Sequence, residues 1–355
     1  MPKTPDTNDS AVSRRGFLRD ISAVVVTGTV LSSCARAASA SAGSSAGRAL
    51  ATAARKPAID GIGLQLYTVG DQLRTDFAGT IERVAQIGYR QVEFAGYGTN
   101  TPAQIRALLD RLKLKAPSTH IGLEVLRKDL DAQLDIAQTI GHEFVTLPSL
   151  GRSETPMNTV NAWKRIADEC NTMGEKVRRR GMTLAFHSHS AEFVDVGGGK
   201  TGMDVFVSET DPAVFTFEMD LGWARVANQD PVAWFARYPG RFRMWHVKDF
   251  DSLSVAQARE AQSLRNLAAG TPTPRPAGPP PAPGAGIRSG GASAPQPGRP
   301  CPVGSGDIDF KPILAAWQSS GLEYFFVEQD GAAGWPGGSL KSVETSYQTM
   351  RTLLG

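Results

Sequence analysis

Short apolar runs alternate with longer amphipathic stretches along this chain from about residue 59 to its end. Apolar runs bounded by turn-forming residues predict buried strands, and apolar residues repeating every three to four positions predict helices. Strands that alternate with helices in this way build a parallel sheet. The predicted strands are 63–69, 91–94, 115–119, 144–147, 183–186, 214–219, 243–245 and 324–327.

The number of predicted strands favours a closed sheet. Eight strands separated by helices over this length fit a (β/α)8 TIM barrel, an α/β fold in which the first strand pairs with the last. The clearest helical stretches are 77–87, 105–114, 126–140, 159–180 and 343–354. An open dinucleotide-binding sheet is disfavoured, because no G-x-G-x-x-G motif follows the first strand.

Residues 1–34 are predicted to be an export signal. Arg14 and Arg15 lie in the sequence SRRGFL, which is typical of a twin-arginine signal, and an apolar stretch follows at 21–31. This stretch is shorter than the roughly 20 apolar residues that span a bilayer. The sequence LSSC at 31–34 is typical of a lipobox, which predicts lipidation of Cys34 and a periplasmic protein anchored to the membrane by lipid. The alternative is cleavage in the Ala-rich tract 35–42 and release of a soluble protein.

Two further segments differ from the barrel in composition. Residues 35–56 are rich in Ala, Ser and Gly and are predicted to be a flexible linker, so that the folded domain occupies 57–355. Residues 269–303 are rich in Pro and Gly and are predicted to be a disordered insertion after the seventh strand. Cys170 lies in a helical stretch and Cys301 in the insertion, and we expect one buried thiol and one exposed thiol rather than a disulfide.

Histidines and carboxylates gather where the predicted strands end. The carboxyl ends of parallel strands meet at one rim of a barrel, and imidazole nitrogens and carboxylate oxygens are ligands for divalent metals. The sequence therefore predicts a metal site at this rim. The fifth histidine, His142, begins the fourth strand instead and is expected to be structural. The residues at or near the rim are Glu93, His120, His187, His189, Asp220, His246 and Glu328.

The alternation of side chains along a strand lets these residues share the inside of the barrel. Side chains two positions apart lie on one face, so His187 and His189 point the same way, as do His246 and Lys248. By the same rule Asp220 shares a face with Glu218, and Glu328 with Asp330. All of the predicted ligands can therefore point into the barrel mouth.

Several motifs along the chain resemble those of the sugar phosphate isomerase/epimerase family, which has the xylose isomerase-like TIM barrel. The resemblance covers residues from about 59 to the end, except the Pro-rich insertion. The motifs are GLQLYTV at 63–69, VEFAGY at 92–97, HSHSAEF at 187–193, MDLGW at 219–223, WHVKD at 245–249, GSGDID at 304–309 and VEQD at 327–330.

The resemblance implies a divalent ion, Mn²⁺, Zn²⁺, Mg²⁺ or Co²⁺, held by Glu, Asp, His and Glu from the last four barrel strands. Asp220, His246 and Glu328 match the last three of these ligands. The family's glutamate falls near His187, so either His187 or Glu192 from the following loop is expected to be the first ligand. The resemblance also implies a small carbohydrate substrate. The formal charge of +3 and the lack of a Lys/Arg tract do not suggest a nucleic acid partner, and the sequence does not predict the oligomeric state.

We expect an isomerase or epimerase that removes a proton next to a carbonyl and forms an enediolate. His189, Glu328 and Lys248 are the predicted catalytic residues, with Glu93, His120 and Trp223 predicted to contact the substrate. Export favours a sugar without phosphate. The alternatives are a metal-dependent lyase or hydrolase of 3-keto-glycosides, which acts by β-elimination, and a sugar-binding lipoprotein without catalysis. An apurinic-site endonuclease would need a trinuclear zinc cluster with more histidines than this chain supplies after its sixth and seventh strands.

Overall fold

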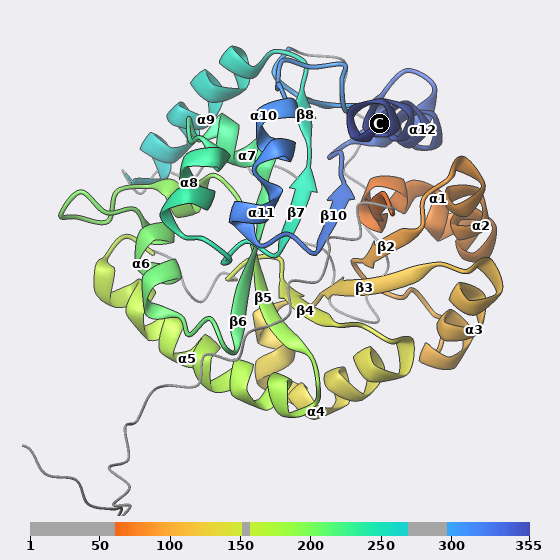
Figure 1. The fold of residues 1–355 in the computed structure, drawn as a ribbon, viewed down its shortest axis with the longest axis horizontal. Coiled ribbons are helices and arrows are strands. Elements are labelled where there is room, and N and C mark those ends of the chain that lie inside the picture. The colour runs from red at the N-terminus through yellow and green to blue at the C-terminus, as the bar shows by residue number, and fades with distance from the viewer. Residues whose placement is uncertain (1–60, 151–156, 269–296) are drawn as a thin grey trace, which may run out of the picture. The chain divides into compact units, whose positions relative to one another are not determined.

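Eight parallel strands form a closed barrel in the computed structural model, which describes residues 61–150, 157–268 and 297–355 (Figure 1). Each strand pairs with its neighbours in sequence among the barrel strands, and the first pairs with the last, so that Gly63 lies opposite Phe326. This confirms the predicted (β/α)8 TIM barrel. The strands are β1 Gly63–Gln65, β2 Gln91–Phe94, β3 Lys115–His120, β4 Phe144–Leu147, β5 Thr183–Ser188, β6 Phe215–Asp220, β7 Met244–Val247 and β10 Tyr324–Val327.

Helices surround the barrel, and several begin at capping residues. Thr101 forms a capping box with Gln104 at the start of α3, and Asp76 accepts a hydrogen bond from Gly79 N at the start of α2. No helix within the described ranges is both long and apolar enough to cross a membrane. The α-helices are α1 Gly70–Thr75, α2 Phe77–Ile87, α3 Pro102–Leu112, α4 Leu123–Ile140, α5 Val160–Arg179, α6 Gly202–Glu209, α7 Leu221–Val226, α8 Pro231–Arg237, α9 Leu253–Ala268, α10 Lys311–Ala315, α11 Trp317–Ser320 and α12 Gly338–Leu354.

The last helix closes the helical layer beside the first ones. Figure 1 shows α12 next to α1 and α2. The hydroxyl of Tyr89, which precedes β2, donates a hydrogen bond of 2.8 Å to the carbonyl of Val343 in α12, and its ring packs on Tyr347. The two ends of the barrel sequence are thereby joined in the helical layer as well as in the sheet.

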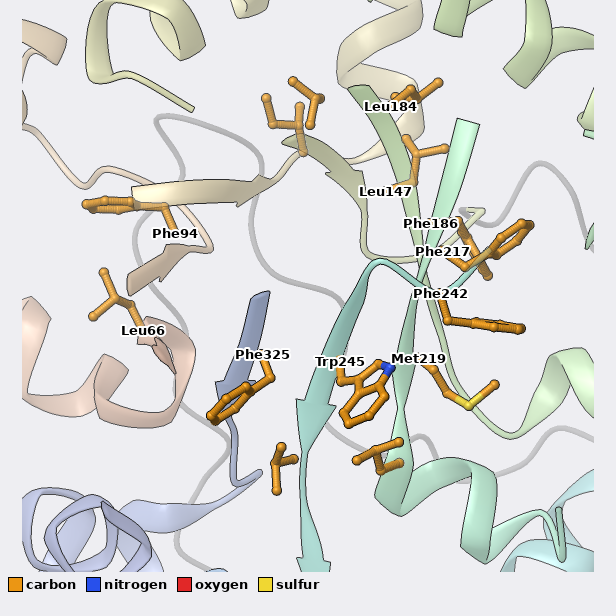
Figure 2. Close-up of a cluster of buried hydrophobic side chains, with 14 of the residues drawn as sticks. Leu66, Phe94, Leu147, Leu184, Phe186, Phe217, Met219, Phe242, Trp245 and Phe325 are labelled. Atoms are coloured by element: carbon orange, nitrogen blue, oxygen red, sulfur yellow. The ribbon is translucent and has the colours of Figure 1, made fainter. Parts of the chain in front are cut away.

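Alternation along the strands divides apolar side chains from polar ones. Outward side chains such as Phe186, Phe217 and Trp245 pack against the helices (Figure 2), and each contributes roughly 2–3 kcal/mol on burial. Inward residues at the amino-terminal half of the barrel form a smaller apolar cluster, made of Phe144, Ala185, Met244, Tyr324 and Phe326. The next inward positions of β5, β6 and β7 are polar, which places the charged residues at the carboxyl ends of these strands.

The first strand is shorter than predicted. β1 ends at Gln65, and Leu66–Val69 forms the 3₁₀ helix η1. The cause is local, because the Gln65 side chain accepts a hydrogen bond from Tyr67 N at 2.9 Å and turns the chain away from the sheet. Two other 3₁₀ helices, η2 Ala191–Phe193 and η3 Ala332–Gly334, follow β5 and β10.

The end of the Pro-rich insertion is ordered, contrary to the prediction for 269–303. Residues 297–303 are part of the described structure, where β9 Pro300–Cys301 pairs antiparallel with β8 Asp249–Phe250. Cys301, predicted to be exposed, is fully buried, and both described cysteines are free thiols. Asp251 fixes this segment by accepting hydrogen bonds from Gly298 N and Arg299 N. Residues 269–296 lie outside the described residues, as do the predicted export signal, Cys34 and the predicted linker.

Candidate metal centre

Polar side chains replace the apolar ones inside the barrel as the strands approach their carboxyl ends. In β5 the inward Ala185 is followed by His187, and in β7 the inward Met244 is followed by His246. In β6 the inward positions are Glu218 and Asp220. All of these polar side chains are almost completely buried. Because a buried charge is costly unless it is paired, so many of them together indicate a functional site.

Two overlapping groups of four residues have ligand atoms within 4.8 Å of one another. The inner group is His120, His187, Glu218 and His246, and the rim group is His187, Asp220, His246 and Glu328. His187 and His246 belong to both groups. One oxygen, Glu218 Oε2, lies 3.0 Å from His120 Nε2, 3.2 Å from His187 Nδ1 and 3.2 Å from His246 Nε2.

Glu93 from β2 completes the inner side of the site. Its Oε2 lies 2.6 Å from His246 Nε2, and its Oε1 lies 3.3 Å from His120 Nε2. Gln65 and Ser118 also donate hydrogen bonds to this carboxylate, at 2.8 and 2.5 Å. Glu93 is completely buried. The structure therefore places Glu93, and His120 beside it, among the internal partners of the histidines, and their contact with a substrate stays a prediction.

The rim group has the composition and the spacing of a divalent-metal site. His187 Nε2 lies 3.8 Å from Asp220 Oδ2, and His246 Nδ1 lies 2.8 Å from Glu328 Oε2. The other oxygen of Asp220 accepts a hydrogen bond from Trp223 N at 2.9 Å, which fixes the carboxylate at the start of α7. Two nitrogens and two carboxylates suit Zn²⁺, Mn²⁺ or Co²⁺. The residues present therefore fit the ion that the family resemblance implies.

Lys248 places a buried positive charge against the same carboxylates. Its Nζ lies 2.9 Å from Asp220 Oδ2, 2.9 Å from Glu328 Oε2 and 2.7 Å from Asp330 Oδ2. It also lies 5.5 Å from the centre of the Trp223 ring. A metal in the rim group would share Asp220 and Glu328 with this ammonium group.

The charges of the site shift the pKa values of its members in opposite directions. Burial raises the pKa of Asp220 to about 6, since Lys248 only partly offsets the cost of burial and the repulsion from Glu328. Burial also raises the pKa of Glu218, as does Glu93, but the neighbouring imidazoles outweigh both and bring it to about 2. His120 shows the converse, because Glu93 and Glu218 outweigh burial and raise its pKa to about 9. The inner carboxylates are therefore held as anions by the histidines around them.

Of the two candidate site residues that follow β5, His189 lies beside the rim group and Glu192 lies outside it. His189 is half-buried, with its ring 4.6 Å from that of His187 and 6.2 Å from that of Trp223, so it lies beside the rim group. Glu192, the alternative first ligand, accepts a hydrogen bond of 2.6 Å from His189 N and belongs to neither group. Burial raises the pKa of Glu192 to about 7. The geometry thus favours His187 over Glu192 as the fourth rim ligand.

Glu218 is a buried member of the inner group that was not among the site residues predicted from the sequence. It precedes Asp220 by two positions in β6, so the alternation of the strand already placed it on the inward face. Its place inside an apolar strand, and not at the end of one, distinguishes it from the residues that were predicted. Asp330 was missed as a partner of Lys248 for a similar reason, since it lies in the loop beyond β10.

Comparison with known proteins finds a family that has the same barrel fold. The family model described as the xylose isomerase-like TIM barrel matches residues 81–348, which is most of the chain. The chain belongs to this family. A curated relative, inosose dehydratase from Lacticaseibacillus casei, is 24% identical over 281 residues, a match that covers 73% of this chain and 85% of the relative.

Solved structures of family members have the same barrel. A sugar phosphate isomerase/epimerase from Parabacteroides distasonis has a TM-score of 0.59 and 24% identity, covering 81% of this chain and 92% of that protein. The IOLI protein, solved with a zinc atom, has a TM-score of 0.55 and 10% identity, covering 83% and 98%. The names of these relatives are inosose dehydratase, a sugar phosphate isomerase/epimerase and a protein with a bound zinc atom. At sequence identities of 24% and 10%, the two solved structures establish the shared fold.

Proposed function

We propose that this protein is a divalent-metal-dependent enzyme that removes a proton from the carbon next to the carbonyl of a sugar or keto-sugar, and that it returns the proton as an isomerase or epimerase does. The observation that carries the proposal is the rim group, two imidazoles and two carboxylates with ligand atoms within 4.8 Å of one another. They lie at the carboxyl-terminal face of the barrel, where TIM-barrel enzymes hold their active sites.

The groups around the rim supply the parts that such a proton transfer needs. A bound divalent ion would act as a Lewis acid toward the carbonyl of the substrate. Glu328, a member of the rim group, and His189, whose ring lies beside His187, are the groups proposed to take and return the proton. Lys248 lies against Asp220 and Glu328, where its positive charge stabilises negative charge that develops on the substrate oxygen.

Dehydration is the second candidate, and it is favoured by the names of the curated relatives, which are inosose dehydratases. It begins with the same removal of a proton beside a carbonyl. The electron pair then expels the hydroxyl group on the next carbon, which leaves as water after taking a proton from an acid such as His189. Elimination from a 3-keto-glycoside follows the same course, with the glycosidic oxygen as the leaving group.

An experiment in deuterated water separates these outcomes. The metal-loaded protein is incubated with free keto-sugars, with inosose and with 3-keto-glycosides, and the products are followed by NMR. Deuterium at the carbon beside the carbonyl, with the hydroxyl groups retained, supports the isomerase or epimerase, whereas an unsaturated product supports elimination. Glu328→Gln should abolish the exchange, and Glu323→Gln, at the other end of β10, is the matched control. A wild-type protein that exchanges no deuterium with any of these compounds would contradict the proposal.

We further propose that the protein is exported and lipidated at Cys34. The support is the sequence alone, namely Arg14 and Arg15 before an apolar stretch and the LSSC motif at 31–34. Replacing both arginines by lysine should leave the full-length chain in the cytoplasm. Cys34→Ser should prevent labelling with a radioactive fatty acid without preventing export. A protein that remains cytoplasmic with both arginines intact would refute this proposal.

A further inference from the structure

We propose that Glu192 is a positioning residue that holds His189 in place beside the rim group. The inference rests on the proposed function, which assigns His189 to proton transfer. Glu192 is part of the motif HSHSAEF at 187–193, but its carboxylate belongs to neither group of candidate ligand atoms. Its contacts point to a different role, in the backbone of the loop that carries His189.

The carboxylate of Glu192 is buried without a positively charged partner. The residue is only 9% exposed, and within the described ranges no Lys, Arg or His side chain forms an ion pair with it. Its Oε2 instead accepts a hydrogen bond of 2.6 Å from His189 N. Burying a carboxylate is costly, and an apolar side chain would avoid that cost. Stability alone therefore does not explain a glutamate at this position.

The hydrogen bond from His189 N closes a short turn directly after β5. Glu192 lies in η2 and reaches back along the chain to the backbone of His189. Phe193 N donates to the Ser190 carbonyl at 3.2 Å and closes the same turn. Because its N–H is held, His189 has a fixed direction for its side chain. The turn thereby keeps the half-buried His189 ring 4.6 Å from the ring of His187.

Two further contacts tie this turn to helices outside the barrel. Ser190 Oγ donates a hydrogen bond of 2.6 Å to Glu260 Oε1 in α9. The ring of Phe193 packs edge-on against Trp234 of α8, with 5.3 Å between the ring centres. These contacts fix the outer side of the turn. The bond to Glu192 is the one that acts on His189 directly.

The position of His189 should affect the rate of reaction more than the binding of substrate. A group that transfers a proton must lie within hydrogen-bonding reach of the reacting atom. A displacement of about 1 Å can lower the rate roughly 100-fold. His189 is proposed to move a proton and not to hold the substrate. Loss of the bond to Glu192 should therefore lower kcat and leave KM nearly unchanged.

The test compares Glu192→Leu and Glu192→Gln with wild type in the full-length chain. Leucine removes the acceptor, whereas the side-chain oxygen of glutamine can still accept from His189 N. Amide hydrogen exchange at His189, followed by mass spectrometry, needs no substrate. The kcat and KM for deuterium exchange into D-fructose and inosose are measured with the Co²⁺-loaded proteins. Glu323→Leu, which removes a carboxylate paired with Arg243 at the other end of β10, is the control.

In Glu192→Leu we expect amide exchange at His189 to be at least about tenfold faster and kcat to be roughly 10- to 100-fold lower, with KM nearly unchanged. Glu192→Gln should retain both wild-type properties, and Glu323→Leu should change neither. Wild-type exchange and kcat in Glu192→Leu overturn the inference, as does an equal loss of kcat in Glu192→Gln.

Two further outcomes are kept apart from these. If Glu192→Leu does not fold, Ser190→Ala, which removes the bond to Glu260, is judged by the same amide exchange and the same split between kcat and KM. A wild-type protein that exchanges no deuterium into either compound contradicts the proposed function instead. Amide exchange at His189 then still decides whether Glu192 holds the turn.

Discussion

Single residues decide how strongly the rim group would bind a metal ion, and the positive charge of Lys248 opposes such binding. Its ammonium lies 2.9 Å from both Asp220 Oδ2 and Glu328 Oε2. Like charges in a poorly solvated site repel strongly. Lys248→Met should therefore raise the affinity for Co²⁺ by at least about tenfold, while catalysis falls because the positive charge beside the substrate is lost.

Chelator competition measures this affinity directly. Lys341→Met, which removes an exposed lysine of α12 paired with Glu344, is the matched control and should leave the affinity unchanged. An affinity that falls in Lys248→Met would mean that the lysine holds the carboxylates in place for the metal instead of competing with it.

His142 has a structural role, and pH should reveal it. Its Nδ1 donates to the Ala116 carbonyl at 2.6 Å, and its Nε2 lies 3.0 Å from the Tyr97 hydroxyl. Burial lowers its pKa to about 4, whereas a histidine in an unfolded chain has a pKa of about 6.5. Above pH 6.5 neither state binds a proton here. Between pH 6.5 and 4 only the unfolded state does, so this residue lowers stability by about 3 kcal/mol across that window.

His142→Asn, which keeps a donor near Ala116, should remove this contribution. The difference in free energy of unfolding between wild type and variant, measured by chemical denaturation, should change in the variant's favour from pH 6.5 to 4 and stay constant above pH 7. Parallel curves for the two proteins over the whole range would show that His142 is protonated in the folded state.

At the scale of elements, the loop after the insertion is built around one carboxylate. Asp249 in β8 accepts hydrogen bonds from the backbone N–H groups of Gly304, Gly306 and Ile308 at 2.9–3.2 Å. This arrangement holds the segment GSGDID against β8, which begins directly after Lys248. A Cβ at Gly306 would lie 2.3 Å from the Phe250 carbonyl oxygen and 2.4 Å from Asp249 Oδ1, so only glycine fits.

Gly306→Ala should consequently displace this loop and lower the free energy of unfolding by roughly 1–3 kcal/mol. Thermal and chemical denaturation measure the loss. Gly122→Ala is the control, because a Cβ there meets no atom within 4 Å and Gly122 has a negative φ. Equal stability of the two variants would contradict the tight packing of the loop on Asp249.

The barrel strands were predictable from sequence because each is a short apolar run with turn formers at its ends. Seven of them agree closely with the prediction; β1 differs because a side chain, Gln65, turns the backbone at a point where the apolar pattern continues. The short helices α6, α7, α8, α10 and α11 were not predicted, since they have too few residues to show a helical repeat. The pairing of β8 with β9 joins residues on either side of the insertion, which local patterns do not reveal.

The site was predictable in part because side chains alternate between the two faces of a strand. Strand parity brought His187, Asp220, His246 and Glu328 to one face, and the structure places them together. Parity does not show how far along the barrel axis a side chain lies, so the short distances from Glu218 to histidines of three other strands were not predicted. Both Glu218 and Asp220 point into the barrel from β6, but only Glu218 belongs to the inner group. Which of the two lies deeper depends on how neighbouring strands are shifted along one another in the closed sheet.

At the scale of the whole molecule, the closed barrel brings each residue of the rim group from a different strand or from the position just after it. β5, β6, β7 and β10 are consecutive in the sheet (Figure 1), and His187, Asp220 and His246 lie on the first three, while Glu328 directly follows β10. The apolar cluster below them and the helices outside keep these strands fixed, so the four rim residues would bind an ion at little cost in conformational entropy. Such a scaffold suits different reactions on one metal, which agrees with the different enzyme names among its relatives.

The most direct test of this account is the metal content of the purified full-length protein and of His246→Ala, after both have been loaded with Zn²⁺, Mn²⁺ or Co²⁺ and dialysed. We predict about one tightly held divalent ion per chain in the wild type, and its loss in His246→Ala while the barrel remains folded by circular dichroism. A wild-type protein that retains no divalent ion under any of these conditions, or a folded His246→Ala that binds as well as wild type, would contradict the central claim.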